Sequence, residues 1–234
     1  MFQYDPAIMA QFPQTVGGVL MASGMQNCMS DDALLALYQT EQQATLARIG
    51  DTALSDLATL AAWRDAFRAF GVNPTKTRSA PEALLRRLTK KGDIPSINTL
   101  VDIGNLISIR YALPVAIFDT QALTGTLKVS FADGSERFTE LGSDEIKHPD
   151  DGEVIFSDET GLVFARRWCW RQSMQSAAKL ETSDAIIVIE AQHANAQTDI
   201  EQAQADLHAL LLEFAGGTYQ SAILNQEQLS FKLA

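Results

Sequence analysis

The chain has 234 residues, of which 46% are hydrophobic and 20% charged, and its 29 acidic and 18 basic residues give a net charge of −11. This length suits one globular domain or two small ones, and the abundant apolar residues exclude a largely disordered chain. No apolar run reaches the roughly 20 residues that span a bilayer, and the first residues lack the basic and apolar regions of a signal peptide. We therefore expect a cytoplasmic protein with no membrane partner.

The acidic surplus argues against a general nucleic-acid binder, because neutralisation of phosphates supplies most of the non-specific affinity of such proteins. The two cysteines, Cys28 and Cys169, lie far apart in the sequence, so we expect no disulfide framework. The three histidines form no metal-ligand pattern, and we expect neither a metal nor another cofactor.

The N-terminal part of the chain predicts one strand followed by helices. Residues 16–21 form a short apolar run that predicts an opening strand after an irregular arm. Asp31 or Asp32 offers an N-cap for the helix that follows. Apolar residues three and four apart predict a second helix over 53–70, which Gly71 ends.

Two more helices follow in the pattern. Ser79 and Glu82 are spaced as in a capping box, with a proline in the first turn, and predict the start of a helix. A further helix is predicted over 99–111. Its residues Asp102 and Asn105 lie one turn apart on the same side.

From Pro114 the hydrophobic period becomes that of strands, with Asp-Gly turns between them that favour antiparallel hairpins. The expected strands cover 115–118, 126–131, 136–139, 154–157, 162–165 and 185–190. A last helix is expected over 198–215. This order predicts the α+β class, a mostly antiparallel sheet flanked by helices, in a single domain over 1–234.

The charge is unevenly distributed. Between Arg64 and Lys91, eight basic residues face two acidic ones, a local charge of +6, and the rest of the chain carries −17. A solvated helical face explains such a stripe, and a docking face for a phosphate backbone is the sharper alternative. The candidate contacts in that alternative are Arg78, Arg86, Arg87, Lys90 and Lys91.

Two of the three tryptophans lie among arginines at 166–171. Strand-like alternation predicts Trp168 and Trp170 on one face, with Arg167 and Arg171 on the other. Two interpretations stay open. The segment is either a buried aromatic pair flanked by structural ion pairs, or a site where rings stack on a base or an aromatic amino acid while guanidiniums hold phosphate.

Glu190 directly follows the buried-type strand Ile186–Ile189. A carboxylate at this place is either a charge at the rim of the sheet or a hydrogen-bonding group at the mouth of a pocket. The sequence contains no nucleophile motif of the serine hydrolases and no glycine-rich phosphate loop. Any hydrolysis would therefore proceed without a conventional catalytic triad.

An ordered series of short motifs over about 63–190 resembles the tRNA-editing module of the phenylalanyl-tRNA synthetase beta subunit, formed from its third and fourth domains. The motifs are Ile94-Pro-Ser-Ile-Asn98, Leu100-Val-Asp-Ile-Gly-Asn105, Leu113-Pro-Val115, Phe118-Asp119, Leu123-Thr-Gly125, Glu136-Arg-Phe138, Gly152-Glu-Val154 and Ile189-Glu190. The segment Arg166-Arg-Trp-Cys-Trp-Arg171 is similar to a signature of the free-standing relatives of that module.

The resemblance implies a function. In the synthetase this module hydrolyses tyrosine wrongly esterified to the phenylalanine tRNA. Asn98, Asp102 and Asn105 match the family pattern Ile-Asn-x-x-Val-Asp-x-x-Asn, whose Asn lines the editing pocket. Glu190 matches the Glu that meets the tyrosine hydroxyl, and that hydrogen bond would explain discrimination against phenylalanine.

These matches predict a stand-alone trans-editing factor, an aminoacyl-tRNA hydrolase acting on a tyrosyl-tRNA(Phe)-like substrate. The partner expected is the acceptor end of a tRNA, bound transiently, and not DNA. The predicted catalytic residues are Asn105, Glu190 and Arg171. The predicted substrate-binding residues are Asn98, Asp102, Arg167, Trp168 and Trp170.

The sequence departs from the family at two places of consequence, and at one of them the segment Arg166–Arg171 stands where the synthetases carry a glycine-rich loop. Bacterial synthetases have a His in Gly-Gln-Pro-x-His-Ala-Phe-Asp, and this chain has Ala116 there. This difference, with the net charge of −11, supports the alternative of a non-catalytic module that binds an amino acid or tRNA in a remodelled pocket.

Overall fold

Several helices begin and end where the local sequence predicts. In the computed structural model, which describes residues 1–232, Asp31 caps α2 (Asp32–Ile49) and its carboxylate accepts the Leu34 N–H at 2.8 Å. α5 (Thr99–Tyr111) has the predicted bounds, and Asn98 caps it in the same way. The last predicted helix is α6 (Ala196–Phe214), which begins two residues earlier than expected.

Two helix predictions need correction. The helix expected over 53–70 is divided into a 3-10 turn, η1 (Leu54–Asp56), and α3 (Ala58–Ala69), because Leu57 has an extended backbone. α4 (Ala80–Lys91) begins after Ser79 as predicted, but the hydroxyl of Ser79 makes no hydrogen bond within residues 1–232. Glu82 instead accepts a hydrogen bond from Arg64 at 2.8 Å, so the capping box is absent.

The N-terminal arm is ordered rather than irregular. It forms a three-residue strand, β1 (Phe2–Tyr4), and a short helix, α1 (Pro6–Gln11), before the predicted strand β2 (Val16–Ser23). β1 pairs in parallel with β4 (Leu127–Phe131) and antiparallel with β12 (Ser230–Phe231). A three-residue strand is too short to show a period in the sequence.

The strands form two main sheets. The six-stranded sheet has the order β12-β1-β4-β7-β8-β9, and the four-stranded sheet has the order β11-β2-β10-β3. The strands not yet given bounds are β3 (Val115–Asp119), β7 (Val154–Ser157), β8 (Val163–Arg166), β9 (Arg171–Gln172), β10 (Ala185–Ala191) and β11 (Thr218–Leu224). A small hairpin pairs β5 (Phe138–Thr139) with β6 (Ile146–Lys147). The predicted α+β class with mostly antiparallel pairing is confirmed, but the strands divide into two main sheets instead of the one expected. β6, β9, β11 and β12 were not predicted.

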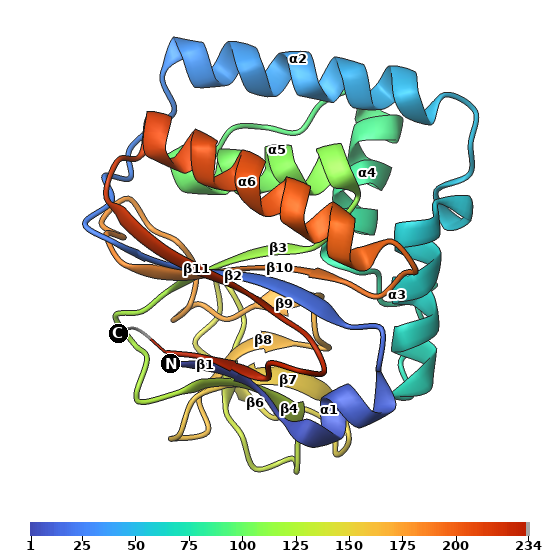
Figure 1. Cartoon of the computed structure of the whole chain (residues 1–234), viewed down its shortest axis with the longest axis vertical. Coiled ribbons are helices and arrows are strands. Elements are labelled where there is room, and N and C mark those ends of the chain that lie inside the picture. Colours follow the sequence, from blue (N-terminus) through green and yellow to red (C-terminus); the bar gives the residue numbers. More distant parts are fainter. Residues whose placement is uncertain (233–234) are drawn as a thin grey trace.

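The elements stack in layers (Figure 1). α2 lies outermost, α5 and α6 cover one face of the four-stranded sheet, and the six-stranded sheet lies against the opposite face, with α3 at one side. One hydrophobic core fills the space between the helices and the four-stranded sheet, and a second fills the space between the two sheets.

The alternation of side chains along β10 decides where Glu190 points. Ile187 and Ile189 belong to the core on the helical side, whereas Ile186 and Val188 belong to the core between the sheets. Successive side chains of a strand point to opposite faces, so Glu190 shares the face of Ile186 and Val188. The fold therefore places this carboxylate between the two sheets.

The single domain over 1–234 stays a prediction, and residues 233–234 lie outside the described ones. Within residues 1–232, no helix combines the length and the apolar character needed to cross a membrane.

Candidate functional site

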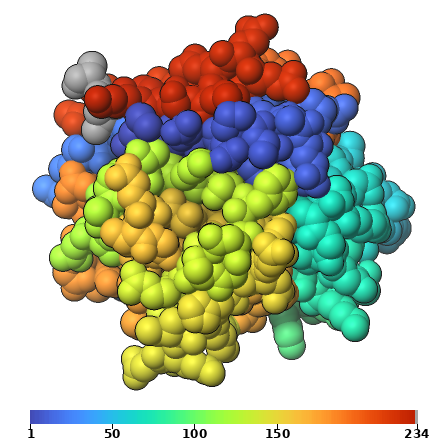
Figure 2. Space-filling model, turned by 90° about the horizontal axis from the view of Figure 1, so that it is seen from below, coloured from blue at the N-terminus to red at the C-terminus, as the bar shows by residue number. Residues whose placement is uncertain are grey.

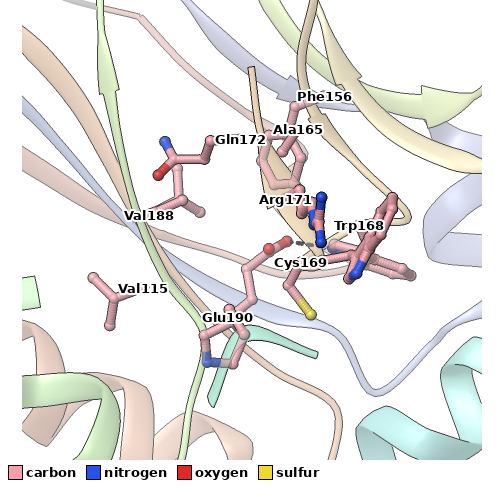
Figure 3. Close-up of a pocket in the computed structure, with 13 residues that line it drawn as sticks. Val115, Phe156, Ala165, Trp168, Cys169, Arg171, Gln172, Val188 and Glu190 are labelled. Carbon is pink, nitrogen blue, oxygen red and sulfur yellow. Dashed lines mark hydrogen bonds between the residues drawn. The ribbon is translucent and has the colours of Figure 1, made fainter. Parts of the chain in front are cut away.

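A buried carboxylate with two hydrogen-bond donors forms the centre of the candidate site. Glu190 is only 3% exposed. Its Oε1 atom accepts the Tyr4 hydroxyl at 2.8 Å and the Trp168 indole N–H at 2.9 Å. Both donors use Oε1. The other carboxylate oxygen, Oε2, has no hydrogen-bond partner among residues 1–232. Figure 3 shows the carboxylate directed toward the Trp168 side of the pocket.

The surroundings of Glu190 change its acidity. Burial raises the pKa of Glu190 from 4.5 to about 7, because the charged form loses its hydration. The hydrogen bonds from Trp168 and Tyr4 act in the opposite direction, since they stabilise the carboxylate, but burial is the larger cause. Both the protonated and the ionised forms are therefore populated near neutral pH, which is a common property of functional carboxyl groups.

Glu190 lines a cavity of about 130 Å³. The walls combine apolar groups with a few polar ones, and Figure 3 shows that they come from both sheets and from the turn after β8. The lining residues are Ala80, Pro114, Val115, Ala116, Phe156, Ala165, Trp168, Cys169, Trp170, Arg171, Gln172, Val188 and Glu190. Since an apolar cavity of about 150 Å³ accepts benzene, this space suits an aromatic ring or a side chain of similar size.

A glycine makes the contact between Tyr4 and Glu190 possible. Gly17 lies directly opposite Glu190 in the ladder between β2 and β10. A Cβ atom at position 17 would clash with the Tyr4 hydroxyl, so the phenol reaches the carboxylate across the bare backbone of Gly17. Tyr4 is a site residue that the sequence analysis missed. The Gly17-Gly18 pair within an apolar strand was the available signal, since glycine in a strand marks a close approach.

The predicted alternation of Trp168 and Trp170 is wrong. Residues 167–170 form a turn between β8 and β9 instead of a continuous strand. Arg167 and Trp168 both have left-handed backbones, with φ angles of 47° and 60°. This turn directs Trp168 into the core between the sheets, where it packs edge-to-face against Phe12 and Trp63, and leaves Trp170 half-buried.

Trp170 is held between two arginines. The guanidinium carbons of Arg167 and Arg171 each lie 4.7 Å from the centroid of its ring, a cation–π geometry. Arg171 also pairs with Glu140, and its side chain is 49% exposed where it lines the cavity. The tryptophans are therefore not a buried pair: Trp168 is buried in the core, and Trp170 with Arg171 lines the cavity, so the roles of Trp168 and Trp170 toward substrate stay predictions.

Arg167 has a different environment from Arg171. Its guanidinium donates to the Thr77 hydroxyl at 3.0 Å, and its backbone N–H donates to Glu153 at 2.9 Å. Arg167 is not among the residues that line the cavity. Its assignment to substrate binding stays a prediction.

Two of the three polar residues predicted on and before α5, Asn98 and Asp102, hold the local backbone. Asn98 caps the helix and accepts the Val101 N–H at 3.0 Å. Asp102 is fully buried and accepts hydrogen bonds from the hydroxyls of Ser30 and Ser96 and from a backbone N–H. Neither these two residues nor Asn105 lines the cavity at Glu190. The structure does not bring them together with Glu190, and their roles toward substrate stay predictions.

The predicted basic contacts lie on α4 and just before it. Arg86, Lys90 and Lys91 are exposed and form no ion pair with any of residues 1–232, whereas Arg78 and Arg87 lie 3.7 Å from carboxylates. α4 starts at the cavity, because Ala80 lines it and donates its N–H to the Cys169 carbonyl at 2.7 Å. In Figure 2, the cyan segment that contains α3 forms one side of the visible face.

Residues 1–232 contain no group of three or more His, Cys, Asp or Glu side chains that could hold a metal ion. Cys28 and Cys169 are free thiols, and burial raises the pKa of Cys169 well above its usual value.

Comparison with known proteins identifies the relatives of this chain. The model of the B3/4 domain family matches residues 62–209. The phenylalanine–tRNA ligase beta subunit of Shewanella oneidensis is 30% identical over 94 residues, which cover 40% of this chain and 12% of the ligase subunit. The corresponding subunit of Neisseria gonorrhoeae is 33% identical over 91 residues, which cover 39% and 11% of the two chains.

A solved structure is also similar. An N-terminal fragment of the phenylalanyl-tRNA synthetase beta subunit from Pyrococcus horikoshii aligns over 94% of this chain and 50% of its own, with a TM-score of 0.48 and 11% identity. The aligned segments span only about an eighth of the length of the two bacterial ligase subunits. The predicted relationship to the beta subunit is confirmed. Because the family model matches well over half of its residues, the chain belongs to the B3/4 domain family.

Proposed function

We propose that this protein is a stand-alone hydrolase that cleaves the ester bond of a mischarged aminoacyl-tRNA in the cytoplasm, with a tyrosyl-tRNA(Phe)-like substrate. One observation carries the proposal. Glu190 is a buried carboxylate with one oxygen held by Tyr4 and Trp168 and the other without a partner in the described structure, beside a cavity of about 130 Å³. This is the residue that matches the hydroxyl-binding Glu of the editing module.

The geometry supports recognition of a phenol. A tyrosyl side chain in the cavity would donate its hydroxyl to Oε2 of Glu190 while its ring contacts the apolar walls formed by Phe156 and Val188. Phenylalanine would fill the same walls and leave a buried carboxylate unpaired. A site built to bond a hydroxyl rejects the analogue that lacks it by about 10⁴-fold or more when the polar group is fully desolvated.

The reaction makes modest demands on the protein. Water attacks the ester carbonyl, the bond to the ribose oxygen breaks, and a free amino acid and a tRNA with its hydroxyl restored are released. An aminoacyl ester is already reactive, so positioning of the water and stabilisation of the oxyanion supply the rate. Arg171, exposed at the cavity, is suited to hold the oxyanion or the terminal phosphate.

Asn105 is proposed as a catalytic residue only because it matches the family pattern. The same holds for Asn98 and Asp102 as substrate contacts, since none of the three lines the cavity.

The position of α4 is consistent with binding of a tRNA acceptor end. Its first residue, Ala80, lines the cavity, and its exposed face carries Arg86, Lys90 and Lys91. A substrate that enters the cavity with its aminoacyl group can therefore extend its backbone along a positive surface. Contacts of this kind are transient and sensitive to salt.

A second candidate function is a binding module without catalysis. Ala116 lines the cavity at the position where the synthetase family carries a His, so the chain lacks that polar group beside the substrate. Such a module would bind an aromatic amino acid or the tRNA and release it unchanged.

A deacylation panel tests the two candidates against each other. Wild type is incubated with tyrosyl-tRNA(Phe) and other misacylated tRNAs, in parallel with Glu190→Gln and with Glu213→Gln, which removes an exposed carboxylate on α6. A hydrolase should cleave the tyrosyl ester rapidly as wild type and as Glu213→Gln, and more slowly as Glu190→Gln, which no longer binds the tyrosyl hydroxyl in preference to other side chains. A thermal shift with tyrosine or tRNA but rates equal to buffer would instead identify a binding module.

A further inference from the structure

Four basic side chains surround a hollow of about 380 Å³ between η1, α3 and α4. The hollow also contains three hydroxyl groups, and it is separate from the cavity at Glu190 because the two share no lining residue. Its polar lining residues are Ser55, Arg64, Thr75, Arg78, Glu82, Arg86, Thr89 and Lys90.

One carboxylate offsets part of this charge. Glu82 is the acidic residue among those that line the hollow, so four cations and one anion leave a net charge of +3, in a chain whose total is −11. Oε1 of Glu82 lies 2.8 Å from Arg64 and 3.7 Å from Arg78. The carboxylate is buried and anchors both guanidiniums, which reduces the entropy they would lose on binding a ligand.

The other two cations have no such anchor. Arg86 and Lys90 lie four residues apart on α4, so their side chains are neighbours, and neither forms an ion pair with residues 1–232. A pair of like charges at this spacing destabilises a helix. An anion between them would remove this repulsion.

We propose that this hollow binds a phosphate group of an RNA backbone. Planar guanidiniums offer paired N–H donors that match phosphate oxygens, and a lysine with neighbouring hydroxyls completes a set of donors around the anion. The identification of the RNA as the substrate tRNA rests on the proposed function; the affinity of the hollow for a phosphodiester does not.

The hollow and the cavity lie along the same helix, α4. Ala80 at the start of α4 lines the cavity, and Lys90 near its end lines the hollow. Arg78 and Glu82, two residues on either side of Ala80, also line the hollow. Lys90 lies about 15 Å from Ala80 along the helix, a distance that a few nucleotides of a single-stranded acceptor end can cover. A phosphate held in the hollow would thus fix the strand whose terminal aminoacyl group occupies the cavity.

A second exposed lysine provides a matched test. Lys90 lines the hollow and Lys76 does not, although both are exposed, carry the same charge and form no ion pair with residues 1–232. Binding of deacylated tRNA is measured by fluorescence anisotropy over a salt series for wild type and for Arg86→Ala, Lys90→Ala and Lys76→Ala. We expect Arg86→Ala and Lys90→Ala to weaken binding about five- to tenfold and to reduce the salt slope by about 1, and Lys76→Ala to change it less than about twofold.

Equal losses in Lys90→Ala and Lys76→Ala would overturn the proposal, because they would show a diffuse basic face without a defined site. A second arm titrates inorganic phosphate, followed by NMR. Phosphate binding without tRNA binding would overturn the assignment to RNA and indicate a site for a small phosphorylated ligand.

Failure of the phosphate site can be distinguished from failure of the proposed hydrolase function. Deacylated tRNA carries no ester, so its binding needs no hydrolysis, and Glu190→Gln should bind it as wild type does. Binding that depends on Lys90, together with an inactive wild type in the deacylation panel, would support the hollow and contradict the hydrolase. Absence of tRNA binding at low salt would contradict the hollow even if hydrolysis is observed. Arg64→Ala is avoided, because it removes the closer partner of the buried Glu82.

Discussion

The Tyr4 hydroxyl donates a hydrogen bond of 2.8 Å to Oε1 of Glu190, a residue 186 positions later in the chain. This bond joins β1 of the six-stranded sheet to β10 of the four-stranded sheet. With the Trp168 indole as the second donor, it fixes the orientation of the carboxylate and leaves Oε2 for an occupant of the cavity. The candidate site therefore depends on three segments that are distant in the sequence.

Removal of the Tyr4 hydroxyl should reduce stability more at high pH than at low pH. Tyr4→Phe keeps the ring, which packs edge-to-face against Phe2 at 5.2 Å, and deletes a hydrogen bond to a charged acceptor. We expect the free energy of unfolding to fall by about 1–3 kcal/mol at pH 8, where Glu190 is ionised, and by less at pH 5. Urea denaturation at both pH values measures this difference.

Tyr219→Phe is the matched control for that experiment. The Tyr219 hydroxyl donates to the Gly216 carbonyl, which carries no charge, so its removal should cost the same at both pH values. A loss in Tyr4→Phe that does not depend on pH would show that the hydroxyl does not stabilise an ionised Glu190.

The pKa of Glu190 predicts a specific pH dependence of stability. The folded-state pKa of about 7 lies above the ordinary value of 4.5, so the folded chain holds this proton more tightly than the unfolded chain. The tighter proton binding adds to the free energy of unfolding. This added stability is fully present below about pH 4.5 and is lost as the pH rises through 7, a change on the order of 3 kcal/mol. Glu190→Gln cannot ionise and should lack this loss.

Denaturation of wild type and Glu190→Gln between pH 4 and 8 tests that prediction. The difference in unfolding free energy between the two proteins should move in favour of the Gln variant as the pH rises. Parallel pH profiles would mean that Glu190 titrates near its ordinary value.

Local sequence patterns predicted many of the helices and strands, and α5 and β7 show why. Both have the predicted bounds, because a capping Asn or a run of β-branched and aromatic residues specifies them within a few positions. β1 was missed, since three residues carry no periodicity and its pairing with β4 joins positions more than a hundred residues apart. The sequence alone therefore could not identify Tyr4 as a site residue.

The turn after β8 shows a second limit of sequence reasoning. Arg167 and Trp168 adopt left-handed backbones that favour glycine, so the sequence gives no sign of the turn that directs Trp168 toward Glu190. Glu190 itself was named from the sequence, because it follows a run of apolar residues and matches a family motif, although it lies within β10 and not after its end. Its second donor and its register against Gly17 depend on tertiary structure.

Gly17 should not tolerate a side chain while Tyr4 is present. In Gly17→Ala the new methyl group would displace the Tyr4 hydroxyl from Glu190, and we expect a loss of more than about 1 kcal/mol of unfolding free energy. The double variant Gly17→Ala/Tyr4→Phe lacks the clashing oxygen, so its loss should be smaller than the sum of the two single losses. Additive losses in this double-mutant cycle would contradict the close approach.

Arg171 should matter for activity and little for stability. Its ion pair with Glu140 involves a side chain that is 49% exposed, and such pairs contribute about 0–1 kcal/mol. Under the proposed function, Arg171→Ala should lower kcat/KM for aminoacyl-tRNA at least about tenfold, as expected for removal of a group that stabilises developing charge. Arg68→Ala, which breaks an exposed ion pair with Asp65, serves as the control. A variant as active as wild type would exclude Arg171 from the reaction.

The role of Glu190 is tested most directly by the rate of ester hydrolysis by wild type and Glu190→Gln under single-turnover conditions, with tyrosyl-tRNA(Phe) and phenylalanyl-tRNA(Phe) as substrates. If Glu190 binds the tyrosyl hydroxyl, wild type hydrolyses the tyrosyl ester far faster than the phenylalanyl ester, and Glu190→Gln loses this preference while it remains folded. Hydrolysis of both esters at the rate of buffer, or an unchanged preference in Glu190→Gln, would contradict this role.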